Sequence, residues 1–477
     1  MTPFAKAGGL ADVAGALAKY LHADGHDIRL FMPAYRTIRR EELEIYPVDF
    51  LQDIPLQLGA YSYRFSVLTA RLPGSKAFVY LIDCPACYDR PAIYTGDADE
   101  HRRFLLLTHA AFLCCQRMNF APQILHFNDW HTAIGPLLQR SVYGWDRLFQ
   151  SARSVLTIHN IGYQGVIGAA AAPEILPPQH QSLLHQDELR AGRINLLRLG
   201  IMYADLITTV SPTYAQEIQT AEYGAGLQED LRVRADRLVG ILNGVDYDDW
   251  DPRHDHYLPQ HYNANQLGIK AVLKAQLQQR LDLLPRKDVA LVGIVSRMTE
   301  QKGFDLLFEA LPRLLNTQAM QLAVLGSGDR RYEEFFGTLQ RQFPDRVHFH
   351  RGYSDELAHW IEAASDLFLM PSRYEPCGLN QMYSLRYGTV PIVRRTGGLA
   401  DSVTGFDAAT STGTGLLFDD YTPDAVTRTV SEALTLYGNR GTWRRLVRNG
   451  MKQDFSWKRQ VPHYVAAYER LLNVTSV

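Results

Sequence analysis

The 477-residue sequence has few cysteines and no long apolar run, and both absences narrow the class of protein. The cysteines number five, and Cys84 and Cys87 form a single CxxC without a second pair at matching spacing. This pattern favours reduced thiols in a cytoplasmic protein over a disulfide framework or a zinc site. Because no run of 18 apolar residues occurs, we expect no transmembrane helix and no membrane partner.

The sequence also lacks an excess of positively or negatively charged residues. The 49 Lys and Arg residues nearly balance the 51 Asp and Glu residues, giving a net charge of −2. A near-neutral chain creates no broad field for nucleic acid, so we expect no nucleic-acid partner, and any phosphate must be bound by a local cluster of cations. The N-terminus has neither a basic and apolar signal segment nor an Arg/Ser-rich transit segment, which favours a cytoplasmic location.

Several catalytic motifs are absent as well. The sequence contains no GxxxxGK[ST] loop, no glycine–serine–glycine elbow and no helix with paired metal-binding histidines. These absences weigh against a P-loop ATPase, a serine hydrolase and a metalloprotease. We expect no metal site and no resident cofactor.

The second half of the chain alternates short apolar runs with segments of helical periodicity. "VALVGIVS", "QLAVLGSG", "DLFLMPS" and "VPIVRR" read as strands, and "FDLLFEALPRLL" and "YEEFFGTLQRQF" as helices. Near-continuous apolar strands separated by helices predict a parallel sheet covered on both faces. The first half repeats the pattern with more insertions; its expected strands lie near 27–35, 77–83, 123–129, 154–160 and 206–212, and its expected helices include "RRFLLLTHAAFLCCQRM" and "INLLRLGIMYA".

The fold class is therefore α/β, with two Rossmann-like, doubly wound domains. We place the first at 1–247 and the second at 248–455, because the segment 243–256 is rich in Asp, Gly and Pro and lacks apolar periodicity. The amphipathic segment 456–477 is expected to form a helix that packs back on the first domain. Ligands of such sheets bind beyond the carboxyl ends of the strands, so we expect the site in a cleft between the facing domains.

The pentapeptide GGLAD occurs twice, at 8–12 and at 397–401. In the first copy Lys6 precedes Gly8 and Gly9, and a helix follows. Glycines let a ligand approach the backbone, and a helix N-terminus favours anions, so this stretch suits a phosphate. The alternative is a plain glycine turn beside a solvated lysine. We interpret the two copies as glycine turns presented to the same cleft from opposite walls.

Two further strand ends carry charged residues. "GIVSRMTEQKG" places Arg297 and Lys302 in one turn, where two cations can neutralise a diphosphate and the charge that develops as it leaves. The alternative is a solvated basic loop. In "PSRYEPCGLNQMYSL", Glu375 stands between a strand and a helix that begins near Gly378 or Leu379, where a carboxylate can accept hydrogen bonds from sugar hydroxyls.

The first half has polar strand ends of its own. His159 follows a strand in "TIHNIGYQG", and Asp129, Trp130 and His131 follow another in "HFNDWHT". A carboxylate beside an aromatic ring suits a carbohydrate, through hydroxyl hydrogen bonds and ring stacking. The alternatives are a structural histidine and a half-buried tryptophan in a loop.

Taken together and in order, these motifs resemble one family over essentially the whole chain. "KAGGLADVAGAL", "NDWHT", "TIHNIGYQG", "VSPTYAQEI", "ILNGVDYDDWDP", "SRMTEQKGFDLL", "PSRYEPCGLNQMYSLRYGTVPIVRRTGGLADSV" and "FSW" are similar to the bacterial-type glycogen synthases and the plant starch synthases. The resemblance implies the GT-B architecture of facing Rossmann-like domains. It also implies retaining transfer of glucose from ADP-glucose to the non-reducing end of an α-1,4-glucan, in glycogen or starch biosynthesis, without a metal. No oligomeric state follows from it.

The resemblance also assigns roles to residues. Lys6, with Gly8 and Gly9, would approach the donor, Arg297 and Lys302 would hold its diphosphate, Glu375 would lie at the transferred glucose, and His159 would lie beside that glucose. The other donor-binding positions are Asp12, Asn243, Tyr353 (which would stack on the adenine), Cys377, Gly378, Leu379 and Asn380, and the acceptor or cleft positions are Asp129, Trp130 and His131. Two other hypotheses stay open: a retaining transferase that uses UDP-glucose, and a glucan-binding homologue without catalysis.

The sequence departs from the family pattern at two places. The pattern begins with an apolar strand, central in the sheet, whereas only "MTPFA" precedes Lys6, so the first strand of the N-terminal domain is missing from the sequence as given. We expect a start placed too late, with about ten further residues in the natural protein, enough for one strand; the rival is a truncated and impaired protein. Tyr383 replaces the second glutamate of related transferases, which favours the glycogen and starch synthase branch.

Overall fold

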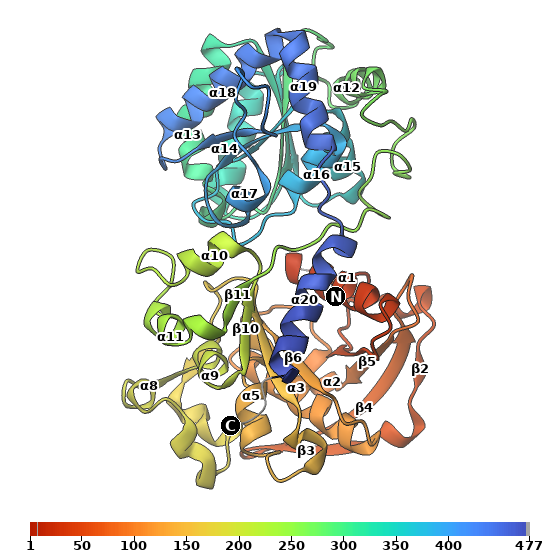
Figure 1. Cartoon of the computed structure of the whole chain (residues 1–477), viewed down its shortest axis with the longest axis vertical. Helices are drawn as coiled ribbons and strands as arrows, with labels where there is room; N and C mark the ends of the chain where they lie inside the picture. Colours follow the sequence, from red (N-terminus) through yellow and green to blue (C-terminus); the bar gives the residue numbers. More distant parts are fainter. Residues whose placement is uncertain (7, 474–477) are drawn as a thin grey trace. The chain divides into compact units, whose positions relative to one another are not determined.

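The computed structural model of the chain describes residues 1–6 and 8–473 (Figure 1). The chain forms two compact units. The first contains 1–210, 215–244 and the segment from Trp457 onward, and the second contains 211–214 and 245–456. Both units combine helices with parallel strands, so the predicted α/β class is confirmed.

The second unit is built on one six-stranded sheet in the order β14-β13-β12-β15-β16-β17, with every pair parallel. Its strands are β12 (Ala290–Val295), β13 (Met320–Gly326), β14 (Val347–Arg351), β15 (Leu367–Met370), β16 (Val390–Arg394) and β17 (Leu416–Phe418). Its helices are α12 (Gly268–Arg280), α13 (Phe304–Thr317), α14 (Arg330–Gln342), α15 (Asp355–Ala364), α16 (Asn380–Tyr387), α17 (Gly397–Ser402), α18 (Pro423–Gly438) and α19 (Arg440–Met451).

Helices cover both faces of this sheet, as Figure 1 shows for α13 and α14 on one side and α12 and α15 on the other. Successive residues of β12 point to opposite faces: Val292 packs with the α13 side and Leu291 with the α12 side. In α13, Leu307, Leu311 and Leu314 recur at helical spacing and are fully buried. A parallel sheet that helices bury on both faces is a doubly wound sheet. The prediction of such a sheet is therefore confirmed for this unit.

The first unit departs from a single doubly wound sheet, because its strands lie in two larger sheets and one small pair. One sheet is parallel with the order β11-β10-β7-β6, and the other has the order β1-β5-β4-β2, with β3 paired to β4. Its strands are β1 (Arg29–Pro33), β2 (Tyr46–Pro47), β3 (Ile54–Leu58), β4 (Tyr61–Arg71), β5 (Phe78–Asp83), β6 (Ile124–Asn128), β7 (Arg153–Ile158), β8 (Val166–Gly168), β9 (Arg193–Asn195), β10 (Leu206–Thr209) and β11 (Leu238–Gly240). The expected strands at 27–35, 77–83, 123–129, 154–160 and 206–212 all form, as β1, β5, β6, β7 and β10.

The antiparallel part of this unit was not predicted. β4 pairs antiparallel with β5, β3 and β2, and buried residues alternate with half-buried ones between Phe65 and Leu68. The described residues that precede α1 form no strand, as we expected from the short "MTPFA" segment. The helices of the unit are α1 (Gly9–Ala23), α2 (Pro85–Tyr88), α3 (Glu100–Arg117), α4 (Asp129–Thr132), α5 (Gly135–Arg140), α6 (Arg147–Gln150), α7 (Ala172–Ile175), α8 (Gln186–Arg190), α9 (Leu196–Tyr203), α10 (Pro212–Glu217, which begins among the residues grouped with the second unit), α11 (Gln228–Val233) and α20 (Trp457–Asn473).

One predicted helix begins later than expected. In "INLLRLGIMYA", Ile194 and Asn195 belong to β9, and α9 starts at Leu196. The side chain of Asn195 accepts a hydrogen bond from the backbone N–H of Arg198, at 3.0 Å. Asparagine is a preferred N-cap, so it ends the strand and opens the helix at the same residue.

The terminal helix α20 packs against α1, the first helix of the chain (Figure 1). Trp457, Val461 and Tyr464 of α20 form an apolar cluster with Val13 and other residues of α1. The first unit therefore contains both ends of the described chain. None of the helices in the described part of the chain is long and apolar enough to cross a membrane.

We predict that Leu307→Ala in α13 lowers the free energy of unfolding by about 2–5 kcal/mol, because it leaves a cavity in a fully buried position. Leu284→Ala is the matched control, since that side chain is 53% exposed and its truncation should change stability by about 0.5 kcal/mol or less. Urea denaturation of both variants measures the difference, and equal midpoints would contradict the packing described here.

Candidate active site

Lys302 and Glu375 meet at the carboxyl ends of β12 and β15. The ammonium of Lys302 lies 2.6 Å from one carboxylate oxygen of Glu375, and the hydroxyl of Ser372 donates to the same oxygen at 3.0 Å. Glu375 is buried, while the Lys302 side chain is 19% exposed. A buried carboxylate is costly unless it is paired and hydrogen-bonded, and this one is both.

Close backbone packing brings these two loops together. Gly303 has φ 71°, and a Cβ there would lie 1.9 Å from the carbonyl oxygen of Pro371. The backbone N–H of Arg373 donates to the carbonyl of Gln301 at 2.9 Å. Only glycine combines this conformation with so little space. Direct contact between their backbones thus brings the two predicted strand-end loops together.

Arg297 belongs to the same turn as Lys302 but has a different environment. Its side chain is exposed. Within the described residues, its guanidinium makes no hydrogen bond or ion pair. The structure therefore joins Lys302 to Glu375 and leaves Arg297 at the same strand end with its donors available.

The second GGLAD copy packs against the backbone of the loop that carries Glu375. Gly397 has φ 44°, and a Cβ there would lie 1.9 Å from the carbonyl oxygen of Glu375. The backbone N–H of Gly398 donates to that carbonyl at 3.0 Å. In the first copy, a Cβ at Gly8 or Gly9 would meet no atom within 4 Å. The two copies therefore differ, because packing requires the glycines of the second copy but not those of the first.

The N-terminus of α16 adds backbone donors beside this pair. Cys377 is buried, Gly378 has φ 69°, and Leu379 precedes the helix, which begins at Asn380. The side-chain amide of Asn380 donates to the carbonyl of Val295 at 2.8 Å, and so ties the start of α16 to the end of β12. Tyr353 follows β14 with its side chain 68% exposed, and its hydroxyl bonds to Asp355.

In the first unit, Lys6 pairs with Asp12 of α1. The two charged groups are 3.1 Å apart, and the hydroxyl of Thr2 donates to the same carboxylate oxygen at 2.9 Å. In the sequence, Gly8 lies between Lys6 and Asp12, and it immediately precedes α1. Lys6 thus has a carboxylate partner of its own in this unit.

A second group of the first unit lies where β6 and β7 end. The carboxylate of Asp129 accepts a hydrogen bond from the backbone N–H of His159 at 2.7 Å and from that of Asn160 at 3.4 Å. The ring Nε2 of His159 lies 2.9 Å from the carbonyl oxygen Oδ1 of Asn128, so Nε2 carries the proton and Nδ1 remains an acceptor. Asp129 holds these contacts with a left-handed backbone, φ 51°.

Burial disfavours the charged forms of His159 and Asp129. It lowers the pKa of His159 to about 3 and raises the pKa of Asp129 to about 7, since a buried site disfavours the ionised form of either group. His159 is therefore a neutral imidazole at neutral pH. A neutral ring with a free Nδ1 can accept a hydrogen bond or face a positive centre without repelling it.

Trp130 and His131 form an aromatic stack next to Asp129. Their ring centroids are 4.4 Å apart, and Phe104 meets His131 edge-on at 4.6 Å. Burial lowers the pKa of His131 to about 3, and neither ring nitrogen has a hydrogen-bond partner among the described residues. Asn243, which the sequence also predicted as a site residue, is buried. Its Oδ1 has no hydrogen-bond partner among the described residues.

Two polar residues of these groups were not singled out from the sequence. Ser372 holds the carboxylate of Glu375, and Asn128 orients the ring of His159. Both stand inside motifs that the sequence analysis used, "PSRYEP" and "HFNDWHT". Both residues lie at strand ends next to residues that were predicted, and this position could have identified them from the sequence.

We predict that alanine lowers Tm in the second GGLAD copy but not in the first. Gly397→Ala should lower Tm by several degrees, because the Cβ would overlap the Glu375 carbonyl and the backbone is left-handed. Gly8→Ala should leave Tm unchanged, since the position is open and extended at φ 168°. Differential scanning calorimetry distinguishes the two, and a larger loss for Gly8→Ala would contradict this assignment.

We also predict a pH-dependent effect of Asp129→Asn. The folded carboxyl holds its proton up to about pH 7, whereas the unfolded value is 3.8, so its contribution to stability is present at low pH and falls as the pH rises towards 7. The amide keeps the acceptor oxygen and tolerates the left-handed backbone but cannot ionise. The stability of the variant relative to the native chain should therefore increase from about pH 4 to about pH 7 and change little above pH 7.

Urea denaturation across this pH range measures the effect, and Asp187→Asn, at an exposed carboxylate, is the control. A difference that stays constant with pH would show that Asp129 is ionised throughout.

The chain is similar to known proteins over most of its length. Residues 1–233 match the family model of the starch synthase catalytic domain, and residues 276–453 match that of the group 1 glycosyl transferases. The chain is 43% identical to a glycogen synthase of Koribacter versatilis over 99% of its own length and 96% of the relative's. It is 40% identical to a glycogen synthase of Thermotoga maritima, with 98% and 97% covered.

Among solved structures, the catalytic domain of starch synthase IV from Arabidopsis thaliana, bound to ADP and acarbose, superimposes with a TM-score of 0.92 at 33% identity and covers 99% of this chain and 97% of that one. This likeness confirms the predicted GT-B fold. The chain therefore belongs to the glycogen and starch synthase family, and it is a glycosyltransferase that synthesises an α-glucan.

Proposed function

We propose that the chain transfers glucose from ADP-glucose to the non-reducing end of an α-1,4-glucan, with retention of configuration. The observation that carries this proposal is the pairing of Lys302 with the buried carboxylate of Glu375 at two neighbouring strand ends, with Arg297 in the same turn. The ADP and acarbose bound to the Arabidopsis catalytic domain support the choice of donor and of a carbohydrate acceptor.

The main barrier to this reaction is the charge that develops on the departing diphosphate. Arg297 has its guanidinium available, and Lys302 can exchange its carboxylate partner for a phosphate. The exchange would release Glu375 to accept hydrogen bonds from hydroxyls of the glucose, while Ser372 keeps it in place. Fixed cations at a developing anion lower the barrier because they need no reorganisation during the reaction.

The start of α16 and the ring of Tyr353 complete the donor site in the second unit. The backbone from Cys377 to Asn380 would face the phosphates, because N–H groups at a helix N-terminus have no partner inside the helix. The exposed ring of Tyr353 offers a flat surface on which an adenine can stack.

The other assigned residues belong to the first unit. We assign His159 to the transferred glucose, where its neutral ring would tolerate a cationic transition state. The remaining assignments are Lys6, Gly8, Gly9, Asp12 and Asn243 to the donor, and Asp129, Trp130 and His131 to the acceptor. The aromatic stack of Trp130 and His131 is an apolar surface of the kind on which sugar rings pack.

We further propose that the enzyme works in the cytoplasm without a metal or other cofactor. Arg297 and Lys302 supply the positive charge that a cation supplies in other transferases. All five cysteines are buried free thiols, which suits a reducing compartment.

Lys302→Ala should reduce kcat/KM for glucose incorporation into glycogen by about 10²–10³, because it removes one fixed cation from the leaving group. The matched control is Arg330→Ala, which removes a cation whose side chain is 87% exposed and whose one ion pair among the described residues is with Glu334 of its own helix. That variant should keep the native rate. Equal activity of Lys302→Ala and the native enzyme would refute the role of Lys302.

ADP-glucose should be the preferred donor, and turnover should persist in the presence of EDTA. Radiolabelled ADP-glucose and UDP-glucose, each offered alone and then in competition, measure the preference by incorporation into glycogen. Faster turnover with UDP-glucose would overturn the donor assignment. Binding of glycogen without incorporation from either donor would indicate a glucan-binding homologue.

A further inference from the structure

The indole ring of Trp250 is held between two helices of the second unit. It stacks on the ring of His359 in α15, with ring centroids 3.7 Å apart and planes inclined by 17°. It also stacks on the ring of Tyr383 in α16, with centroids 4.0 Å apart and planes inclined by 2°. Trp250 lies in the irregular segment 246–262, which precedes α12. One side chain of this segment thus joins α15 to α16.

Aspartates of the same segment make further links to these helices. The carboxylate oxygen Oδ2 of Asp255 accepts hydrogen bonds from Nδ1 of His359, at 2.8 Å, and from the hydroxyl of Tyr387 in α16, at 2.6 Å. The carboxylate of Asp251 accepts a hydrogen bond from Nε of Arg386 in α16, at 3.0 Å. Both aspartates are buried. Because a buried carboxylate is costly without partners, these bonds hold the two helices at defined positions.

The two helices carry the two ends of the proposed donor site. Tyr353 directly precedes Ser354, whose side chain caps α15, and the hydroxyl of Tyr353 bonds to Asp355, the first residue of that helix. The backbone of 377–380 leads into α16. The ring proposed to stack on adenine therefore moves with α15, and the backbone proposed to face the phosphates moves with α16. Their separation depends on the spacing of the two helices.

The helices also meet directly, because the hydroxyl of Ser384 in α16 donates to the carboxyl group of Glu362 in α15, at 2.7 Å. In the sequence of α15, His359 lies between Tyr353 and Glu362. The stack on Trp250 therefore acts on α15 nearer to the adenine end than this direct bond does.

We propose that Trp250 and Asp255 are positioning residues, which set the separation between the adenine surface and the phosphate donors. The proposal rests on the proposed function, because it concerns the same donor site. A nucleoside diphosphate engages both subsites through one molecule, so its affinity depends on their separation. A ligand that occupies a single subsite does not gain from the correct separation.

The test compares Trp250→Ala with the native chain. Isothermal titration calorimetry measures the affinities for ADP, adenosine and inorganic pyrophosphate, each offered alone. We expect the variant to bind ADP about tenfold or more weakly and the two partial ligands less than about twofold more weakly, since only ADP must span both subsites. Trp250→Phe keeps a flat ring between His359 and Tyr383 and should restore most of the affinity for ADP.

A second variant, Asp255→Asn, tests the same role with little change in side-chain size. It exchanges one acceptor oxygen for an N–H donor beside His359 and Tyr387, so it weakens a link between the helices without opening a cavity. We expect the same selective loss of ADP affinity. In glucose transfer, both variants should raise KM for ADP-glucose and leave KM for glycogen unchanged.

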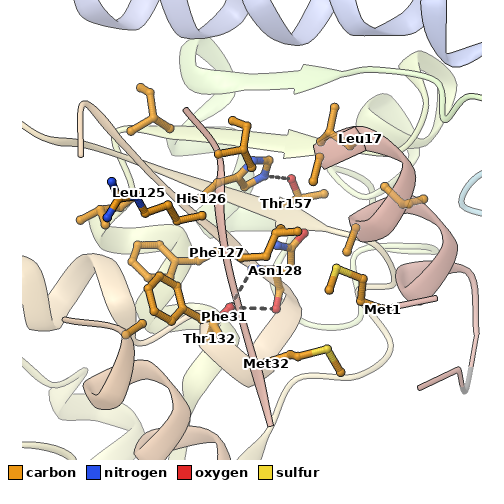
Figure 2. Close-up of a pocket in the computed structure, with 18 of the residues that line it drawn as sticks. Met1, Leu17, Phe31, Met32, Leu125, His126, Phe127, Asn128, Thr132 and Thr157 are labelled. Carbon is orange, nitrogen blue, oxygen red and sulfur yellow. Dashed lines mark hydrogen bonds between the residues drawn. The ribbon is translucent and has the colours of Figure 1, made fainter. Parts of the chain in front are cut away.

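Two controls separate positioning from loss of stability. Leu314→Ala truncates a fully buried side chain at the end of α13 remote from Lys302. Met32→Ala truncates a buried side chain of the first unit, beside a cavity of about 570 Å³ (Figure 2). Both should lower Tm, because each removes buried apolar contacts, and both should keep the native affinity for ADP.

Equal ADP affinity in the native chain, Trp250→Ala and Asp255→Asn would overturn the positioning role and leave the proposed function intact. A parallel loss of adenosine and pyrophosphate binding would also overturn it, since the subsites themselves would then have been damaged. Absence of ADP binding by the native chain would overturn both proposals. A selective loss of ADP affinity in a chain that transfers no glucose would support the positioning role and count against the proposed function alone.

Discussion

The candidate site depends on backbone segments that approach each other so closely that no side chain fits between them. Gly303 lies against the carbonyl of Pro371, and Gly397 lies against the carbonyl of Glu375. These contacts fix the loop that carries Glu375 from two sides, and they bring Lys302 within reach of its carboxylate. The position of the acid is therefore set by the fold itself and does not wait for a substrate. Preorganisation of this kind lets fixed charges act on a reaction without reorganisation.

The two units supply different electrostatic environments. In the second unit, the cationic side chain of Arg297 is exposed to solvent, and that of Lys302 is half-buried beside the carboxylate of Glu375. In the first unit, burial among aromatic and aliphatic side chains keeps His159 and His131 neutral. The strand ends of β12 and β15 thus carry charged side chains, whereas those of β6 and β7 carry neutral imidazoles and an aromatic stack. This division agrees with a donor rich in negative charge and an acceptor that is an uncharged glucan.

Much of the fold followed from the sequence, because strands that are buried on both faces must be apolar throughout. β12 and β13 were predicted for this reason, whereas β4 was not, since its alternating residues serve a half-exposed antiparallel sheet. The site was predictable only as a set of strand ends. The contact between Lys302 and Glu375 joins residues 73 positions apart, and it depends on the backbone packing of two loops. The identical letters GGLAD gave no sign that packing requires one pair of glycines and not the other.

The pairing of α1 with α20 has a consequence for synthesis on the ribosome. Val13 and Leu17 are translated before the second unit, whereas their partners Trp457 and Val461 are translated after it. The second unit is almost continuous in sequence, so its sheet can be completed while the first helix still lacks its cover. The apolar face of α1 must then remain exposed, or be held by a chaperone, through most of elongation. Premature termination anywhere before α20 would leave that face permanently uncovered and the nascent product prone to aggregation.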